Sequence, residues 1–250
     1  MRRARLLVED GVNFKEIVDT KTQALLRHVS ERAREKGMSI NEKKTGLMLV
    51  SAATSFQART RVSLDEETIH GKDCMKVLGV TLTNDLSFYE HVEKIAAKTR
   101  AKTWALSKLR RKGLSEKNLI KTYKCLIRPS LEYAAAAWHS LLTAGQSALL
   151  ERQQSQALKN IFGPSLSAAT LRKKADIETL HSRREALVTR FAKKSLANPR
   201  TNHWFKERPV PSYARRSGVR YPKYREETAR TDRHRNNPKN YLVRKLNECV

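Results

Sequence analysis

The chain has 250 residues, of which 51 are lysine or arginine and 25 are aspartate or glutamate, so its formal net charge is +26. Such a surplus neutralises phosphates and releases their counterions, which favours a nucleic-acid partner. An acidic membrane surface is the much less favoured alternative. No apolar run approaches membrane-spanning length and no signal-peptide core follows the basic start, so we expect a soluble intracellular protein, in the nucleus or the cytoplasm, with no membrane partner.

The first predicted elements are a helix and a small antiparallel sheet. Apolar residues recur at three- and four-residue steps over residues 19–36, which predicts an amphipathic helix that ends at Gly37. Strands are predicted at residues 47–50, 59–64 and 75–83. Together they indicate one small antiparallel sheet over about residues 46–83, with a turn at 65–67 and a central Gly79 in the last strand.

A long basic helix is predicted after Asp85, ending at Gly113. One face is apolar or small and comprises Phe88, Val92, Ile95, Ala96, Thr99, Thr103 and Leu106. The rest of its surface is basic, with Lys94, Lys98, Arg100, Lys102, Lys108, Arg110, Arg111 and Lys112. A row of cations on one helix is suited to follow a phosphate backbone.

Further helical segments follow the basic helix. They are predicted from a cap at Ser115 to Pro129, over 133–138, from Thr143 to Phe162, and over 177–197. The third of these has a Gly163-Pro164 stop signal directly behind it. This half of the chain is therefore expected to be mainly α-helical.

The last segment, from residue 199, changes in composition. It holds 14 Lys/Arg against 5 acids, and it lacks the apolar mass to fold alone, which predicts an extended basic tail with one terminal helix. Its tyrosines are interleaved with basic residues and lie at Tyr213, Tyr221, Tyr224 and Tyr241. They either stack on bases or anchor the tail to the helices.

These elements predict an α+β fold in three parts. Residues 1–84 contain a helix packed on a small antiparallel sheet, residues 85–198 are mainly helical, and residues 199–250 form a basic, partly disordered tail.

Residue patterns that carry catalysis are sparse. The three cysteines, Cys74, Cys125 and Cys249, are far apart and match no metal spacing, which is typical of reduced thiols. The seven histidines show no ligand spacing, and there is no Walker loop and no nucleophile elbow, so no cofactor is predicted for this chain. Glu9 and Asp10 are a weak candidate for a metal-binding hairpin tip, because no further carboxylate precedes them; ordinary turn residues are the alternative.

Two short motifs are more informative. The segment Gly37–Thr45 links the first helix to the sheet through a glycine, Asn41 and two cations, Lys43 and Lys44. A lysine on such a loop is able to approach a phosphate or to protonate a departing pyrophosphate, whereas a solvated turn lysine is the alternative. The second motif, Met75–Val80, contains a glycine that permits a close approach of the backbone to a hairpin partner or a ligand.

In this order and spacing, the two motifs resemble the last palm motifs of reverse transcriptases from non-LTR (LINE-like) retroelements. The resemblance continues through Asn84–Ser87 and the basic helix, then Tyr123 to Tyr133, Trp138-His139, and a pattern of residues from Leu149 to Gly163, which look like the thumb of those enzymes. It covers roughly residues 20–198. It implies an RNA-directed DNA polymerase that uses Mg²⁺ when complete.

The resemblance also implies roles for individual residues. Gly37, Asn41, Lys43 and Lys44 lie in the loop whose lysine, here Lys44, assists nucleotidyl transfer. The hairpin that supports the primer end contains Lys76, Leu78 and Gly79. The cations from Lys94 to Lys112 would follow the template–primer backbone.

The chain departs from that family in its catalytic residues. Fingers, early palm and the first metal-binding aspartate are missing, and no aromatic-x-Asp-Asp motif occurs. We therefore expect a truncated reverse-transcriptase-like protein that lacks an N-terminal polymerase segment and binds RNA, DNA or their hybrid without sequence preference. A stand-alone basic RNA-binding or ribosome-associated protein is the alternative, and an enzyme completed by a partner chain is a third.

Overall fold

The computed structural model describes residues 14–50, 61–64, 67–209, 221–229 and 231–249. Its contacts divide the chain into two units, Met1–Glu90 and His91–Val250. Glu9, Asp10 and Tyr213 lie outside the described residues. The assignment of palm, thumb and tail to parts of the chain stays a prediction.

The first unit begins with helix α2, Phe14–Glu35, which confirms the predicted helix and starts earlier than expected. Gly37 has φ +68°, a conformation that glycine adopts without strain, and it ends the helix as predicted. Strand β1, Arg61–Leu64, pairs antiparallel with β2, Glu67–His70, and α2 packs against β1.

A small apolar core holds this helix against the hairpin. Buried Val62, Leu64 and Ile69 form its centre, and α2 contributes Leu26. The Gln23 side chain adds two hydrogen bonds of 2.7 Å, donating to the carbonyl of Ser63 and accepting from its N–H. These two bonds satisfy polar groups on the open edge of β1.

The predicted single sheet is instead two separate two-stranded sheets. The second consists of β3, Cys74–Val77, and β4, Val80–Thr83, joined by a two-residue turn. Leu78 and Gly79 both have positive φ, 46° and 87°, which reverses the chain where one long strand was expected. Residues 47–50 are not a strand either, because the chain makes only a single bridge there, between Leu47 and Gly71.

The second unit contains the basic helix α3, Tyr89–Arg111. Every position of its predicted apolar face is buried, and Gly113 ends it with φ +87°. The Ser115 hydroxyl caps α4, Glu116–Thr122, as predicted. The helix then continues past the predicted stop: a π-helical segment, Tyr123–Ile127, leads into α5, Arg128–Glu132, with its proline in the first turn, where a missing N–H costs little.

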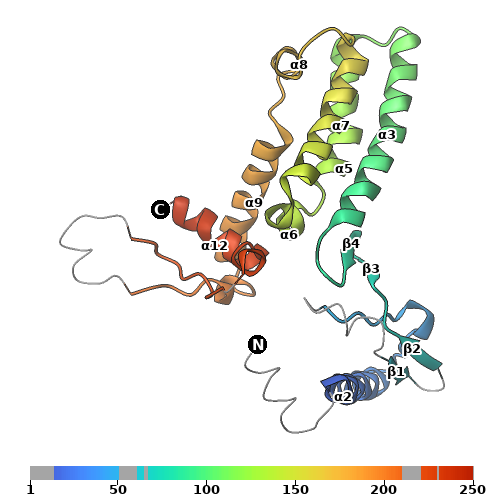
Figure 1. The fold of residues 1–250 in the computed structure, drawn as a ribbon, viewed down its shortest axis with the longest axis vertical. Helices are drawn as coiled ribbons and strands as arrows, with labels where there is room; N and C mark the ends of the chain where they lie inside the picture. Colours follow the sequence, from blue (N-terminus) through green and yellow to red (C-terminus); the bar gives the residue numbers. More distant parts are fainter. Residues whose placement is uncertain (1–13, 51–60, 65–66, 210–220, 230, 250) are drawn as a thin grey trace. The chain divides into compact units, whose positions relative to one another are not determined.

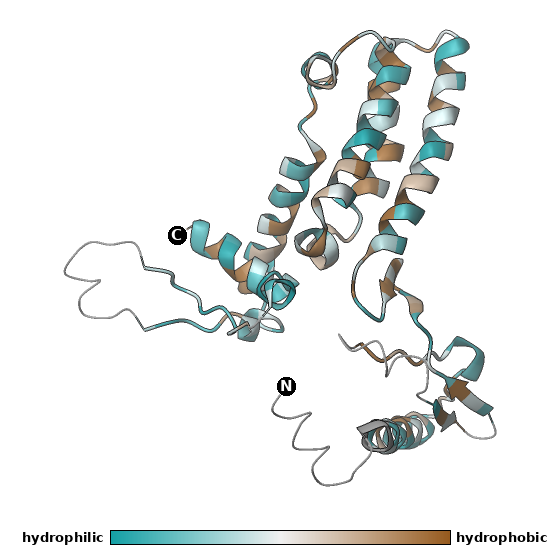
Figure 2. Ribbon diagram, viewed as in Figure 1, coloured by the Kyte–Doolittle hydropathy of each residue, from teal (hydrophilic) through white to brown (hydrophobic). Residues whose placement is uncertain are grey.

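Three longer helices follow the short α6, Ala135–Trp138: α7, Ala144–Phe162; α8, Ala168–Ala175; and α9, Leu180–Ala197. Helix α8 was not predicted, and α9 starts later than the predicted residue 177. Helix α7 packs against α4, α8 and α9 (Figure 1). Figure 2 shows hydrophobic and hydrophilic residues alternating along these helices, as expected when one face of each is buried.

The described part of the tail is folded rather than extended. It contains a 3-10 turn at Asn202–Trp204 and helices α11, Asp232–Arg235, and α12, Pro238–Glu248. Its buried side chains form one core with α9, comprising Val188, Ala192, Phe205, Tyr224, Leu242, Val243 and Leu246. The tail has too little apolar mass alone, as expected, but α9 supplies the missing surface. The fold as a whole is α+β.

Candidate nucleic-acid interface

The loop after α2 is a defined turn that presents two lysines. Asn41 caps the 3-10 helix Glu42–Lys44: its side-chain oxygen accepts from the N–H of Lys44 at 3.1 Å, and its carbonyl accepts from the Thr45 hydroxyl at 2.8 Å. Lys43 and Lys44 are both exposed. Asn41 thus shapes the turn, and the two ammonium groups are available to an anion.

The loop and the β3–β4 hairpin lie against each other in the first unit. A Cβ atom built on Gly46 would come within 2.5 Å of the Met75 side chain, so only glycine fits there without a shift. The carbonyl of Leu47 also accepts from the N–H of Lys72 at 2.8 Å. The residues directly after the first motif, Gly46 and Leu47, therefore contact the second motif and the residues just before it, about thirty residues further along the chain.

The hairpin tip is exposed. Lys76, Leu78 and Gly79 are all exposed, and Leu78 has 88% of its surface open to solvent. A leucine with positive φ is strained relative to glycine or asparagine. The hairpin tip thus exposes an apolar side chain on a turn with positive φ.

The basic residues of α3 divide into two groups. Six of them, counting Lys112 directly after the helix, have side chains exposed to solvent: Lys94, Lys98, Arg100, Lys108, Arg111 and Lys112. Two others are bound within the unit. Lys102 donates to the carbonyl of Leu126 at 2.6 Å and to the Ser130 hydroxyl at 2.5 Å, and Arg110 donates to the carbonyl of Asn160 at 3.2 Å.

The internal role of Lys102 is reflected in its electrostatics. Burial lowers the pKa of its ammonium group, and the nearby Lys98 lowers the pKa further. The side chain ties α3 to the helical segment around Ser130. Lys102 and Arg110, two of the predicted phosphate contacts, therefore donate hydrogen bonds within the unit, which sequence spacing alone did not indicate.

Trp104 was missed by the sequence analysis. It lies on α3 away from the buried face and is 58% exposed, and the Lys108 ammonium group sits 3.7 Å from the centroid of its ring. The sequence did contain an indication of this: Trp104 is a large aromatic residue that does not belong to the apolar face of the helix. Single exposed hydrophobic residues are common, so exposure alone does not indicate a binding role for Trp104. Its basic neighbours are what make it a candidate.

The tail tyrosines that the structure describes act mainly as anchors. Tyr224 is buried; its N–H donates to the Asn247 side chain at 2.9 Å, and its carbonyl accepts from the same amide at 3.0 Å. The Tyr241 hydroxyl donates to Glu185 of α9. Tyr221 is half-buried, with the Arg208 guanidinium 5.7 Å from its ring. For Tyr224 and Tyr241 the anchoring alternative is supported over base stacking.

A second polar cluster joins residues that the sequence left scattered. His139, His181 and Glu185 place one potential metal-ligand atom each within 4.8 Å of one another. However, Arg184 Nε donates to His139 Nδ1 at 3.3 Å, which leaves the ring hydrogen on Nε2, 3.5 Å from Glu185. A metal at Nε2 would need that hydrogen removed, and Glu185 already accepts from Lys245 at 2.8 Å. We interpret the cluster as structural.

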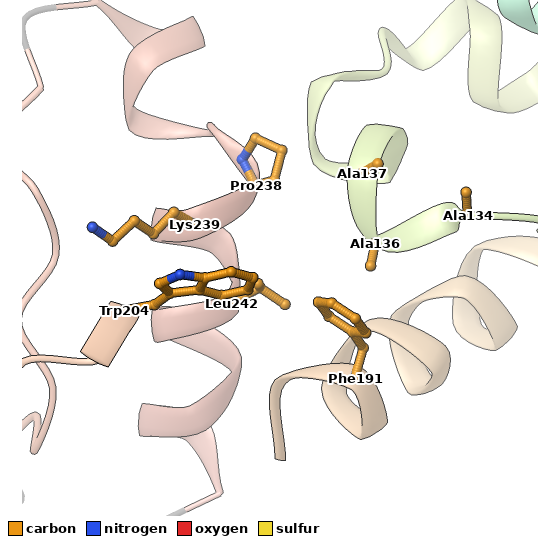
Figure 3. Close-up of a pocket in the computed structure, with 8 residues that line it drawn as sticks. All are labelled: Ala134, Ala136, Ala137, Phe191, Trp204, Pro238, Lys239 and Leu242. Carbon is orange, nitrogen blue, oxygen red and sulfur yellow. The ribbon is translucent and has the colours of Figure 1, made fainter. Parts of the chain in front are cut away.

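An apolar groove of about 610 Å³ lies in the second unit where the tail meets the helices. Phe191 of α9 and Trp204 face small alanines of α6 across it, and Leu242 lines it from α12 (Figure 3). The ammonium group of Lys239 points away from the groove and pairs with Glu227 at 2.6 Å. The groove is a packing gap between large tail side chains and the alanines, and no polar group converges on it.

Comparison with known proteins yields one informative similarity. A segment of 115 residues is 31% identical to the probable RNA-directed DNA polymerase from transposon X-element of Drosophila melanogaster; it covers 44% of this chain and 12% of that relative. No protein-family profile matches the chain, and no solved structure matches it. The chain is thus related to reverse transcriptases over part of its length. No helix among the described residues is long and apolar enough to cross a membrane.

Proposed function

We propose that this chain is the end of a reverse-transcriptase palm with its thumb, and that it binds RNA, DNA or their hybrid without sequence preference. The exposed row of cations on α3 carries the proposal, with the lysine turn at Asn41–Thr45 and the hairpin tip as further contacts. A helix of 23 residues is about 34 Å long at 1.5 Å per residue, which is enough to follow several phosphates.

Ion pairs compensate part of the positive charge of the tail, whereas three cations of α3 stand outside such pairs. All five tail acids pair with a nearby cation, in the pairs Lys223–Glu207, Lys239–Glu227, Arg244–Glu226, Lys245–Glu248 and Arg235–Asp232, and they compensate five of the 14 Lys/Arg of the tail. Lys98, Arg100 and Arg111 of α3 make no ion pair with any other described residue. Their charge is therefore uncompensated and available to phosphates.

The described residues do not fit a Mg²⁺ site of the reverse-transcriptase type. The loop and the hairpin tip present ammonium groups, one amide and a single carboxylate, Glu42, and the Asn41 amide already caps its turn. Among the described residues, three potential metal ligands come together at His139, His181 and Glu185 and not at this loop, so we derive no step through a metal here. We propose that Lys44 contacts a phosphate, and that the chain alone does not extend a primer.

A salt-titrated binding assay tests the location of the interface. We compare the unmodified chain with a triple variant, Lys98→Gln, Arg100→Gln and Arg111→Gln, using a labelled oligonucleotide. The matched control, with the same net charge, is Lys173→Gln, Lys193→Gln and Lys194→Gln, exposed residues of α8 and α9. We expect the α3 variant alone to lower the slope of log affinity against log salt, by about 0.7–0.9 for each lost phosphate contact.

Two outcomes would contradict the proposal. Equal losses in the α3 variant and the control would mean that net charge, and not α3, determines binding. Binding that survives high salt and depends on one sequence would indicate base readout, which the proposal does not include. Primer extension with Mg²⁺ on the same sample is expected to give no product above background, and clear extension would overturn the non-catalytic part.

A further inference from the structure

Trp104 is the exposed tryptophan of the helical unit. Trp138 is fully buried, with its indole N–H donating to the carbonyl of Tyr133 at 2.9 Å, and Trp204 is half-buried in the core shared by the tail and α9. Trp104, in contrast, has 58% of its surface exposed. Trp138 and Trp204 therefore pack within the unit, whereas the ring of Trp104 contacts the ammonium group of Lys108.

The surroundings of Trp104 on α3 are basic. Residues three, four and seven apart lie on the same face of a helix, which places Arg100 one turn before the ring, Lys108 one turn after it and Arg111 one turn further. All three are exposed, and the Lys108 ammonium group sits 3.7 Å from the ring centroid. The face therefore combines one large π surface with three positive charges.

The small residues on this face matter as well. Positions 97 and 101, which precede Trp104 by seven and three residues, are both exposed alanines. A helix face with methyl groups beside the indole leaves room for a flat ligand next to the ring. The same face carries no carboxylate at positions 97, 100, 101, 104, 108 or 111, so an anionic ligand meets no repulsion there.

We propose that Trp104 is a stacking platform for an unpaired base, with Arg100, Lys108 and Arg111 holding the phosphates on either side of that base. This inference rests on the proposed nucleic-acid binding and specifies its ligand as single-stranded RNA or DNA. Charge complementarity selects a polyanion, and the indole selects one whose base faces are accessible. In a duplex the bases already stack on each other, so Trp104 would gain no base contact.

The principal test compares single-stranded and duplex oligonucleotides of one sequence. Stacking on an aromatic residue is typically worth a factor of about 5 to 150 in affinity per base. We expect Trp104→Ala to lose a factor in this range for the single strand and less than about threefold for the duplex. Trp104→Phe, which keeps a ring, should retain most of the affinity.

Phe191→Ala is the matched control, because Phe191 is also an exposed aromatic residue, at 42%, and lies on α9. It should leave the affinity unchanged. Circular dichroism and thermal melting of every variant verify that the fold is retained. If Trp104→Ala and Phe191→Ala weaken binding equally, the specific role of Trp104 is overturned.

A second measurement uses an abasic oligonucleotide, which has the sugar–phosphate backbone without bases. The unmodified chain should bind it more weakly than the normal strand, and only the normal strand should quench the fluorescence of Trp104. The variant Trp204→Phe removes one of the two other fluorophores and sharpens this signal.

The outcomes separate this inference from the proposed function. Equal affinity for abasic and normal strands would overturn stacking and leave charge-based binding intact. Absence of salt-dependent binding to any strand would overturn both. The chain could also self-associate. If Trp104→Ala abolished that self-association and left oligonucleotide binding unchanged, Trp104 would contact a second copy of the chain, and stacking would be overturned.

Discussion

Glu185 connects α9 to the C-terminal helix. It accepts from the Lys245 ammonium group at 2.8 Å and from the Tyr241 hydroxyl, and His139 Nε2 lies 3.5 Å away. Burial alone would raise the pKa of this carboxyl, but the hydrogen bonds from Lys245 and Tyr241 hold it at about 2. Burial, followed by the hydrogen bond to Glu185, raises the pKa of Tyr241 to about 12.

We expect Glu185→Gln to destabilise the second unit by about 1–3 kcal/mol, because it leaves the Lys245 ammonium group, which is 13% exposed, without its half-buried counter-charge. Urea unfolding measures this loss. Glu248→Gln is the control, since Glu248 pairs with the same lysine at 2.9 Å but is 61% exposed, and it should cost less than about 0.5 kcal/mol. Equal losses in both variants would refute a special role for Glu185.

Stability should fall in mild acid because His139 is buried in its neutral form. Burial lowers its pKa to about 4, and the nearby Arg184 lowers it further in the same direction. A group whose pKa is depressed in the folded state contributes stability fully above its unfolded pKa, about 6.5, and loses it as the pH falls toward the folded value. Below about pH 4.5, Glu185 adds to the loss for the same reason.

The measurement is the melting temperature at pH 7.5 and at pH 5. We expect a lower value at pH 5, and a smaller difference in a His139→Gln variant. His91, whose pKa burial also lowers, contributes in the same direction, so the difference should shrink and not vanish. A pH-independent melting temperature in the unmodified chain would show that His139 does not titrate in this range.

At the scale of the elements, the turn of the β3–β4 hairpin contains a residue that is unfavourable for its backbone conformation. Its turn needs positive φ at both positions, and Leu78 adopts it at 46° although asparagine and glycine do so at lower cost. The leucine side chain is also 88% exposed and contributes little to a core. The turn is therefore not optimised for stability at this position.

The variant Leu78→Asn should therefore stabilise the first unit by roughly 0.5–1 kcal/mol, because it relieves strain in a turn of the same geometry. Chemical unfolding followed by circular dichroism measures the change. A loss of stability would mean that the Leu78 side chain packs more tightly than its exposure indicates. Weaker nucleic-acid binding in the stabilised variant would support the role of the hairpin tip.

At the scale of the whole chain, the described tail residues complete the helical unit. Leu242, Val243 and Leu246 of α12 are buried against Val188 and Ala192 of α9. An amphipathic helix of 11 residues is marginal alone, so its stability comes from this packing. Five of the 14 cations of the tail pair with its own acids.

Leu246→Ala tests this packing. We expect a loss of about 2–4 kcal/mol in unfolding free energy and faster proteolysis of the residues after 199, since the substitution opens a cavity in the shared core. Leu126→Ala, at a leucine that is 58% exposed, should cost less than about 0.5 kcal/mol. A Leu246→Ala variant as stable as the unmodified chain would indicate that α12 does not hold the tail in place.

Local features of this protein followed from its sequence. The buried stripe of α3, the Ser115 cap, and the helix ends at Gly37, Gly113 and Gly163 were all predicted. They depend on residues within one or two turns, where backbone geometry and side-chain spacing have few solutions. The loop with Lys44 and the Leu78-Gly79 pair were singled out through the resemblance to a known family, although residues 75–83 were expected to form one strand.

Tertiary structure decided the features that depend on partners far along the chain. Lys102 was predicted to meet phosphate but binds Leu126 and Ser130, and Tyr241 became an anchor because Glu185 lies within reach. Neither outcome is encoded by local spacing, since each side chain takes the best partner that packing brings to it. The sequence by itself determined the excess of positive charge. The fold decided which cations pair with an acid, as five of the tail do, and which stay exposed outside any ion pair with a described residue, as Lys98, Arg100 and Arg111 of α3 do, because an ion pair needs a partner that only packing brings within reach.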